Sequence, residues 1–142
     1  MTSEPTAAAS DAPTGSPPRW SVAGFQAFWN APDPSAVGNA VTEETIGHWP
    51  GRDEPVRGRD SYIACIAAIV RMLPDVRLEV AEHARSGDVT FIRWVMHATG
   101  RAGPFELTGV DCVRVRDGRV AENVIVFDTA AFERRSGYRI PW

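Results

Sequence analysis

Four strand-like segments follow one another in the second half of this 142-residue chain, with turn residues and no helical pattern between them. Segments 76–82 and 105–116 alternate polar and apolar residues, whereas segments 89–96 and 120–127 are apolar on both faces. Glycine-containing turns separate them, and the last turn, Asp117-Gly118, favours a type I′ hairpin. The pattern predicts an antiparallel meander, because a parallel sheet needs a long crossover between successive strands.

Helical patterns occupy the first half of the chain. Residues 21–30 place apolar side chains at helix-face spacings, and Asp33, followed by a proline, predicts a second, short helix. A short strand over residues 45–49 comes next, and then a long helix that we expect Asp60 to cap and Pro74 to end. Helices followed by a meander predict an α+β fold, in which a curved sheet closes over an apolar pocket.

The first nineteen residues differ from the rest. Residues 1–19 are rich in Ala, Pro, Ser and Thr and contain no aromatic or β-branched aliphatic residue, so burial cannot offset the entropy of ordering them. We therefore expect a disordered N-terminal tail over residues 1–19 and one folded domain over residues 20–142.

Charge and cysteine content narrow the class of partners. The net charge is −3 and the basic residues are scattered, which argues against a nucleic-acid partner. No apolar run is long enough to span a membrane, and no secretory signal is recognisable. Cys65 and Cys112 lie far apart without a nearby second cysteine, so they predict two reduced thiols. These features favour a cytoplasmic protein with no membrane association.

His97 and Asp111 are the first candidates for chemistry. If the hairpin around residues 99–104 pairs positions whose numbers sum to 208, His97 lies directly opposite Asp111 on one sheet face. Asp111 would then sit among apolar neighbours, which raise the pKa of a carboxyl group, and a nearby imidazolium would lower it. Such a pair can move a proton near neutral pH, although the two residues could also simply satisfy each other inside the sheet.

Further candidates surround this pair. His48 stands at the end of the first predicted strand, where it is either a second base facing inward or a solvated residue facing outward. No two histidines have the spacing of neighbouring metal ligands, so we expect neither a metal nor another cofactor. Aromatic residues and one arginine are the candidate walls of a substrate pocket: Trp29, Trp49, Phe91, Arg93, Trp94 and Phe105.

Several stretches resemble one family. Residues 108–122, with the sequence TGVDCVRVRDGRVAE, are preceded by HWPG at 48–51, RGR at 57–59 and HATG at 97–100. Together they resemble the SnoaL-like polyketide cyclases of the nuclear-transport-factor-two-like superfamily, over about residues 21–135. The resemblance implies a cone-shaped α+β barrel, in which a strongly curved, mostly antiparallel sheet packs on a long helix. It also implies a homodimer formed through the outer face of the sheet.

The resemblance also implies an activity. In these cyclases an aspartate at the position of Asp111 acts as general acid/base in an intramolecular aldol closure without metal or cofactor, and His97 resembles its partner. The ketosteroid isomerases of the superfamily have a tyrosine where Phe25 or its neighbours stand here, and a carboxylate base at about the position of His48. The epoxide hydrolases have an aspartate two residues after an arginine, whereas Val95 follows Arg93 here. Both departures count against those two activities.

Two classes of function remain open at this point. The first is a cofactor-independent acid/base enzyme of a biosynthetic pathway, which acts on a hydrophobic carbonyl compound as a polyketide cyclase does. The second is a non-catalytic domain of the same fold, which binds a small molecule or mediates dimerisation.

Overall fold

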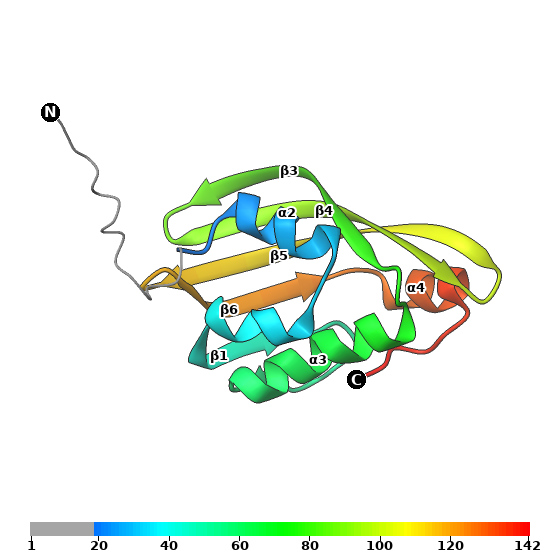
Figure 1. Ribbon diagram of the computed structural model, residues 1–142, viewed down its shortest axis with the longest axis horizontal. Coiled ribbons are helices and arrows are strands. Elements are labelled where there is room, and N and C mark those ends of the chain that lie inside the picture. Colours follow the sequence, from blue (N-terminus) through cyan, green and yellow to red (C-terminus); the bar gives the residue numbers. More distant parts are fainter. Residues whose placement is uncertain (1–18) are drawn as a thin grey trace, which may run out of the picture.

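The computed structural model describes residues 19–142 (Figure 1). The disordered tail predicted for residues 1–19 therefore falls, except for its last residue, outside the described residues. The elements in chain order are α2 (Val22–Asn30), the 3-10 helix η1 (Pro34–Asn39), β1 (Val41–His48), β2 (Val56–Arg57), α3 (Arg59–Met72), β3 (Arg77–Ser86), β4 (Val89–Gly100), β5 (Gly103–Arg116), β6 (Arg119–Val126) and α4 (Thr129–Ser136).

The strands form one curved sheet in the order β2-β1-β6-β5-β4-β3. Strands β3 to β6 make the predicted meander, and β1 joins it through the one parallel pairing of the described sheet, with β6. The strongly curved, mostly antiparallel α+β fold is therefore confirmed. The sheet does not close into a barrel, because β2 and β3 lie at its two edges. Helices α2, η1 and α3 cover its inner face.

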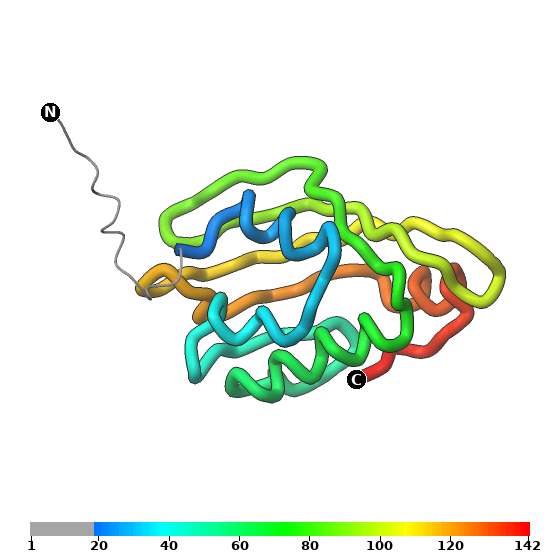
Figure 2. The backbone as a smooth tube through the Cα atoms, in the orientation of Figure 1, coloured from blue at the N-terminus to red at the C-terminus, as the bar shows by residue number. Residues whose placement is uncertain are grey.

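Turn chemistry fixes the ends of the meander strands. The β5–β6 turn is the predicted type I′ turn, with φ of 54° at Asp117 and 79° at Gly118. The β4–β5 hairpin is tighter and longer than predicted, because Gly100 pairs with Gly103 around a two-residue turn. A side chain at Gly100 would meet the backbone of Ser136 in α4, so only glycine lets helix and hairpin approach so closely. Figure 2 shows this hairpin beside α4.

The long helix α3 starts differently from the prediction. Gly58, at a φ of 95°, is the N-cap residue and contributes no side-chain hydrogen bond, so the prediction that Asp60 caps the helix is wrong. Asp60 lies in the first turn instead, where its negative charge still suits the positive end of the helix dipole. The helix buries Tyr62, Cys65, Ile66 and Ile69 against the sheet and ends before Pro74, as predicted.

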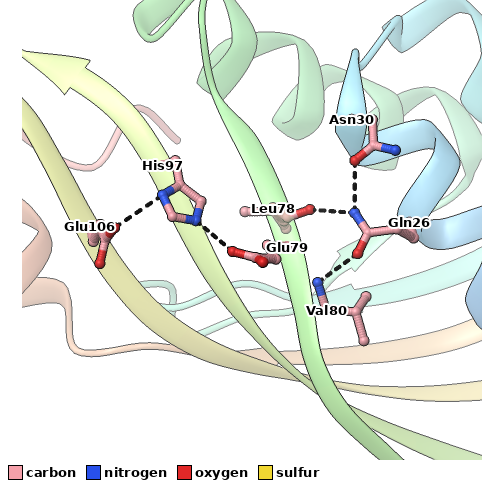
Figure 3. Close-up of polar contacts among 7 residues, drawn as sticks. All are labelled: Gln26, Asn30, Leu78, Glu79, Val80, His97 and Glu106. Carbon is pink, nitrogen blue, oxygen red and sulfur yellow. Dashed lines mark hydrogen bonds and ion pairs between the residues drawn. The ribbon is translucent and has the colours of Figure 1, made fainter.

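A single side chain ties α2 to the edge of the sheet. Gln26 donates a hydrogen bond from Nε2 to the carbonyl oxygen of Leu78 (2.8 Å) and accepts one at Oε1 from the amide of Val80 (2.7 Å), as Figure 3 shows. Asn30 accepts a second bond from the same Nε2 at 2.9 Å. The Gln26 amide thus replaces a neighbouring strand at this stretch of the β3 edge, which would otherwise present unpaired backbone groups.

Candidate functional site

A cavity of about 510 Å³ lies between the inner face of the sheet and helices α2, η1 and α3. This volume suits a small organic molecule. Most of its lining is aromatic or aliphatic, and Asp111, Asn123 and the hydroxyl of Tyr62 are the polar groups that come from the sheet and α3. Its aromatic lining consists of Trp20, Phe25, Phe28, Trp29, Trp49, Tyr62, Trp94, Phe127 and Trp142.

Asp111 projects from β5 into this cavity and is only 6% exposed. Its Oδ1 accepts a hydrogen bond from Nε1 of Trp94 and its Oδ2 accepts one from Nδ2 of Asn123, both at 2.8 Å. Burial raises the pKa of the Asp111 carboxyl to about 6, and the bonds from Asn123 and Trp94 oppose that rise. The group is therefore mostly ionised at pH 7 yet close enough to its pKa to accept and return a proton.

Trp94 reaches Asp111 because of a glycine on the neighbouring strand. Trp94 on β4 pairs with Gly109 on β5, and its ring lies so close to Gly109 that a Cβ there would come within 2.3 Å of a ring carbon. The indole therefore lies flat along β5 with Nε1 pointing at the carboxyl two residues on. The role of Gly109 in the structure is to make room for this ring.

Asn123 and Tyr62 continue the polar network. Asn123, on β6, also donates from Nδ2 to the hydroxyl oxygen of Tyr62 on α3 at 3.0 Å. Directing both amide hydrogens this way leaves the buried Oδ1 of Asn123 without a partner among the described residues. A buried acceptor without a hydrogen-bond partner costs about 1–3 kcal/mol of stability. The orientation of the Asn123 amide that supplies donors to Asp111 and Tyr62 therefore destabilises the fold by about this amount.

His97 does not lie opposite Asp111, so that prediction is wrong. Paired residue numbers in the β4–β5 hairpin sum to 203, which places Ile92 opposite Asp111 and Glu106 opposite His97. The shift of five positions is odd, and an odd shift moves a side chain to the other sheet face. His97 points outward, with Nε2 at 3.0 Å from Glu79 and Nδ1 at 3.2 Å from Glu106 (Figure 3).

His48 also faces away from the cavity. Its Nε2 lies 2.8 Å from Oε2 of Glu122 on the outer face, and its side chain is 40% exposed. Of the two interpretations that the sequence left open for His48, the structure supports the outward-facing residue. Neither histidine is placed to exchange a proton with Asp111 directly.

The candidate pocket walls divide into two groups. Trp29, Trp49 and Trp94 line the cavity. The prediction that Phe91 and Arg93 also do so is wrong, because alternate residues of β4 face outward: Phe91 is 42% exposed and Arg93 pairs with Glu82 at 3.1 Å.

Phe105 is not part of the cavity wall either. It belongs to the far end of the β4–β5 hairpin, where its ring packs edge-on against Phe132 of α4, with ring centroids 6.3 Å apart. The helix that it contacts was not predicted from the sequence, which is why its surroundings were misjudged.

Two functional candidates, Asn123 and Tyr62, were missed. Asn123 is the polar residue among apolar inward positions of β6. It lies diagonally across from Asp111 because the β5–β6 register shifts by one residue between Arg114 and Val115, whereas the register of the turn at Asp117-Gly118 alone would pair Asp111 with Val124 and place Asn123 on the other face. The sequence pattern does not reveal this shift. Tyr62 lies on the buried face of α3, and nothing in the helical periodicity distinguishes a tyrosine that uses its hydroxyl from one that only packs. Within residues 19–142, no three His, Cys, Asp or Glu side chains gather in a way that could hold a metal ion.

Comparison with known proteins agrees with this architecture. The sequence profile of the SnoaL-like polyketide cyclases matches residues 21–135. Comparison with curated protein sequences finds no match.

Solved structures share the fold. A protein from Catenulispora acidiphila with a ketosteroid isomerase-like fold, solved with trimethylamine, superposes with a TM-score of 0.73 at 19% identity, over 85% of this chain and 95% of that one. IdmH from Streptomyces antibioticus, a candidate polyketide cyclase, gives 0.70 at 24% identity over 82% and 96%. TerC, co-crystallised with polyporic acid, gives 0.71 at 19% identity over 82% and 95%.

Proposed function

Because the chain belongs to the SnoaL-like polyketide cyclase family, we propose that it is a cofactor-independent acid/base enzyme that closes a ring in a hydrophobic carbonyl compound. The reaction would be an intramolecular aldol addition in a biosynthetic pathway. One observation carries the proposal: a buried carboxyl group, with a pKa raised to about 6, lies at the wall of an aromatic-lined cavity. A carboxylate in such surroundings is a stronger base than one in water, and it is regenerated when the reaction ends.

Asp111 would act twice in the cycle. Its carboxylate removes a proton from the carbon beside a substrate carbonyl, and the resulting enolate carbon attacks a second carbonyl of the same molecule. The new C–C bond closes the ring, and the alkoxide takes the proton back from Asp111. Since the proton returns, one group serves as base and acid, and no histidine partner is needed. Trp94 and Asn123 hold the carboxyl in one orientation during both transfers.

The aromatic walls favour a flat, apolar substrate. Trp29, Trp49 and Trp94 offer ring faces and edges against which unsaturated or aromatic rings pack well. Binding such a molecule also displaces water from around Asp111, which strengthens its electrostatic interactions with the reacting atoms.

The test is a binding screen with product analysis. Aromatic polyketides, other apolar carbonyl compounds and polyporic acid are screened by ligand-observed NMR against the parent protein and Asp111→Asn, and every binder is incubated and analysed for products. We expect a compound that binds both proteins but is converted only by the parent. Asp53→Asn, which makes the same chemical change at an exposed loop position, should convert it normally.

A different result would replace the proposal. If compounds bind and no protein converts any of them, the chain is better described as a small-molecule-binding domain of this fold. If Asp111→Asn converts substrate as fast as the parent, Asp111 is not the acid/base.

We further propose that the protein is a homodimer that works in the cytoplasm. Phe91, Cys112 and Val124 form one row across the outer face of the sheet, and Val110 and Val126 lie beside it. Phe91 is 42% exposed and Val126 is 53% exposed, so this face presents an apolar patch of the kind that a second subunit covers. Both cysteines are unbridged, in keeping with a reducing compartment, and no helix among residues 19–142 is long and apolar enough to cross a membrane.

A further inference from the structure

The hydroxyl of Tyr62 has a hydrogen that the network does not use. Tyr62 is only 5% exposed, and its ring packs on Trp49 with centroids 5.5 Å apart. Its oxygen accepts the N–H of Asn123, so the O–H hydrogen is available as a donor, and it finds no acceptor among residues 19–142. Tyr62 lines the same cavity as Asp111, and the single amide nitrogen of Asn123 bonds to both of them.

We propose that Tyr62 is a second catalytic residue, whose hydroxyl donates a hydrogen bond to the oxygen of the carbonyl that Asp111 converts to an enolate. This inference rests on the proposed function, because it assigns a role within the same acid/base reaction. Asp111 moves the proton but does not stabilise the negative charge that develops on the enolate oxygen. Tyr62 supplies the hydrogen-bond donor for that oxygen.

The surroundings of Tyr62 suit a neutral donor. Burial, followed by the nearby charge of Asp111, raises the pKa of the Tyr62 phenol, so it keeps its proton at neutral pH. The N–H bond that its oxygen receives from Asn123 polarises the O–H and makes it a better donor. A fixed donor in a dry cavity stabilises a developing oxyanion far more than the same group does in water.

The step balances without a co-reactant. Asp111 takes the proton as the C–H bond breaks, the electron pair forms the enolate C=C bond, and the carbonyl π electrons move to the oxygen. Tyr62 keeps its own proton and only donates a hydrogen bond to that oxygen. When the enolate carbon bonds to the second carbonyl, the charge moves to a new alkoxide, which Asp111 protonates.

The chain contains two tyrosines, which gives a matched control. Tyr62→Phe removes the hydroxyl and keeps the ring that packs on Trp49, whereas Tyr138→Phe makes the same change at a residue outside the cavity, beside Arg101. With any substrate found in the screen, we expect Tyr62→Phe to lower kcat by about 10²-fold with little change in KM. Tyr138→Phe should leave both constants unchanged.

A binding experiment tests the donor without relying on turnover. In Asp111→Asn, whose neutral amide replaces the protonated acid, the cavity should bind 4-nitrophenolate, a flat oxyanion whose absorbance reports its ionisation. Adding Tyr62→Phe should weaken this binding by about 10- to 100-fold, the range for a hydrogen bond to a charged group. Adding Tyr138→Phe instead should have no effect.

A third measurement keeps the proposal testable if Tyr62→Phe folds poorly. Biosynthetic 3-fluorotyrosine in the Asp111→Asn, Tyr138→Phe background places a single, more acidic phenol at position 62 without removing the hydroxyl. Nitrophenolate should then bind more tightly than it does to the same protein with ordinary tyrosine. Unchanged affinity in the fluorinated protein would overturn the assignment.

The outcomes separate this inference from the proposed function. If Asp111→Asn abolishes turnover while Tyr62→Phe alters neither turnover nor nitrophenolate binding, the cyclase proposal stands and the role of Tyr62 is wrong. If Tyr62 controls nitrophenolate binding but no substrate is converted by the parent, the oxyanion site is real and the cyclase proposal fails.

Discussion

At the scale of single residues, the protonation of Asp111 is linked to folding. Its pKa is about 6 in the folded state against 3.8 for an unperturbed group, so between these values the folded state binds more protons than the unfolded chain. The stability contributed by Asp111 is therefore fully present below pH 3.8 and is lost as the pH rises through 6. About two pKa units correspond to a loss of roughly 3 kcal/mol.

This linkage predicts the behaviour of Asp111→Asn. Relative to the parent, its free energy of unfolding should rise between pH 4 and 6 and level off above pH 7, because the amide does not ionise. Urea denaturation of both proteins across this range measures the difference. Asp53→Asn, at an exposed position, should show no such trend, and a pH-independent difference at position 111 would contradict the raised pKa.

Asn123 is expected to control the pH at which Asp111 works. Its N–H lowers the pKa of that carboxyl, so Asn123→Leu should raise the pKa and move the acidic limb of kcat/KM to higher pH. Carbon-13 NMR titration of the Asp111 carboxyl measures the shift without a substrate. Asn30→Leu, at an exposed position on α2, should leave the titration in place, and an unmoved midpoint in Asn123→Leu would show that this bond does not set the pKa.

The prediction that Asp111 lies inward among apolar neighbours is confirmed and the prediction of its partner is wrong, both for one physical reason. A single polar residue among apolar alternating positions marks an inward-facing group whatever the register. The identity of a cross-strand neighbour depends on the turn, and an odd error in register exchanges the two faces. His97, Phe91 and Arg93 were all misplaced by that error.

At the scale of elements, the contact between β4 and β5 depends on Gly109. Gly109→Ala would place a methyl group within 2.3 Å of the Trp94 ring, and both backbone and ring are held by neighbouring strands. We expect a loss of about 1–3 kcal/mol in the free energy of unfolding, from overpacking. Displacement of Nε1 should also raise the pKa of Asp111, because a stabilising N–H bond is lengthened.

The matched control for this change lies in η1. A methyl group at Gly38 would meet its nearest neighbours at 3.7 and 3.8 Å, which is ordinary contact, so Gly38→Ala should unfold at nearly the parent denaturant concentration. Equal stability of the two variants would mean that the Trp94 ring moves aside freely, and that it is not held in place by Gly109.

A second contact between elements is the attachment of α2 to β3 through the Gln26 side chain. Gln26→Ala removes both bonds to the β3 backbone, and we expect about 1–2 kcal/mol of local destabilisation with faster hydrogen exchange at the Val80 amide. Asn30→Ala removes only the bond between the two side chains and should leave Val80 protected. Unchanged exchange at Val80 in Gln26→Ala would show that the amide does not secure this edge.

Element boundaries were predictable where a local signal determines them. The capping residue Ser21 and the turn at Asp117-Gly118 act through neighbours in sequence, and both elements were predicted correctly. Helix α4 was missed although Asp128 caps its start and Gly137 ends it at a φ of 78°. It has few apolar residues, and its stability comes from packing Phe132 against the β4–β5 hairpin, which is a tertiary contact that periodicity does not reveal.

At the scale of the whole molecule, the two faces of the sheet differ in role: the inner face lines the cavity, and the outer face presents an apolar surface. The inner side of β4, β5 and β6 carries Trp94, Asp111 and Asn123, and the outer side of the same strands carries the apolar rows that include Phe91 and Val126. Ion pairs lie next to these rows: Arg93, which pairs with Val110, bonds to Glu82, and Arg114 lies close to Glu122. An apolar centre with a polar rim is the anatomy of a protein interface.

A second copy of the chain is the expected occupant of the outer face. Val126→Asp places a charge where Val126 and Val110 lie side by side, and burying that charge without a partner is unfavourable. Analytical ultracentrifugation should therefore find the parent dimeric and Val126→Asp monomeric at the same concentration. Ala102→Asp, at the exposed tip of the β4–β5 hairpin, should stay dimeric.

Dimerisation also has a consequence for the cavity, because the strands that would meet the partner are those that position Asp111. Losing the partner should loosen β5 and β6, which predicts faster amide exchange at Val110 and Val124 in Val126→Asp and weaker binding of any cavity ligand. A parent protein that sediments as a monomer at all concentrations would refute the dimer. A monomeric Val126→Asp with unchanged exchange and ligand affinity would show instead that the two faces of the sheet act independently.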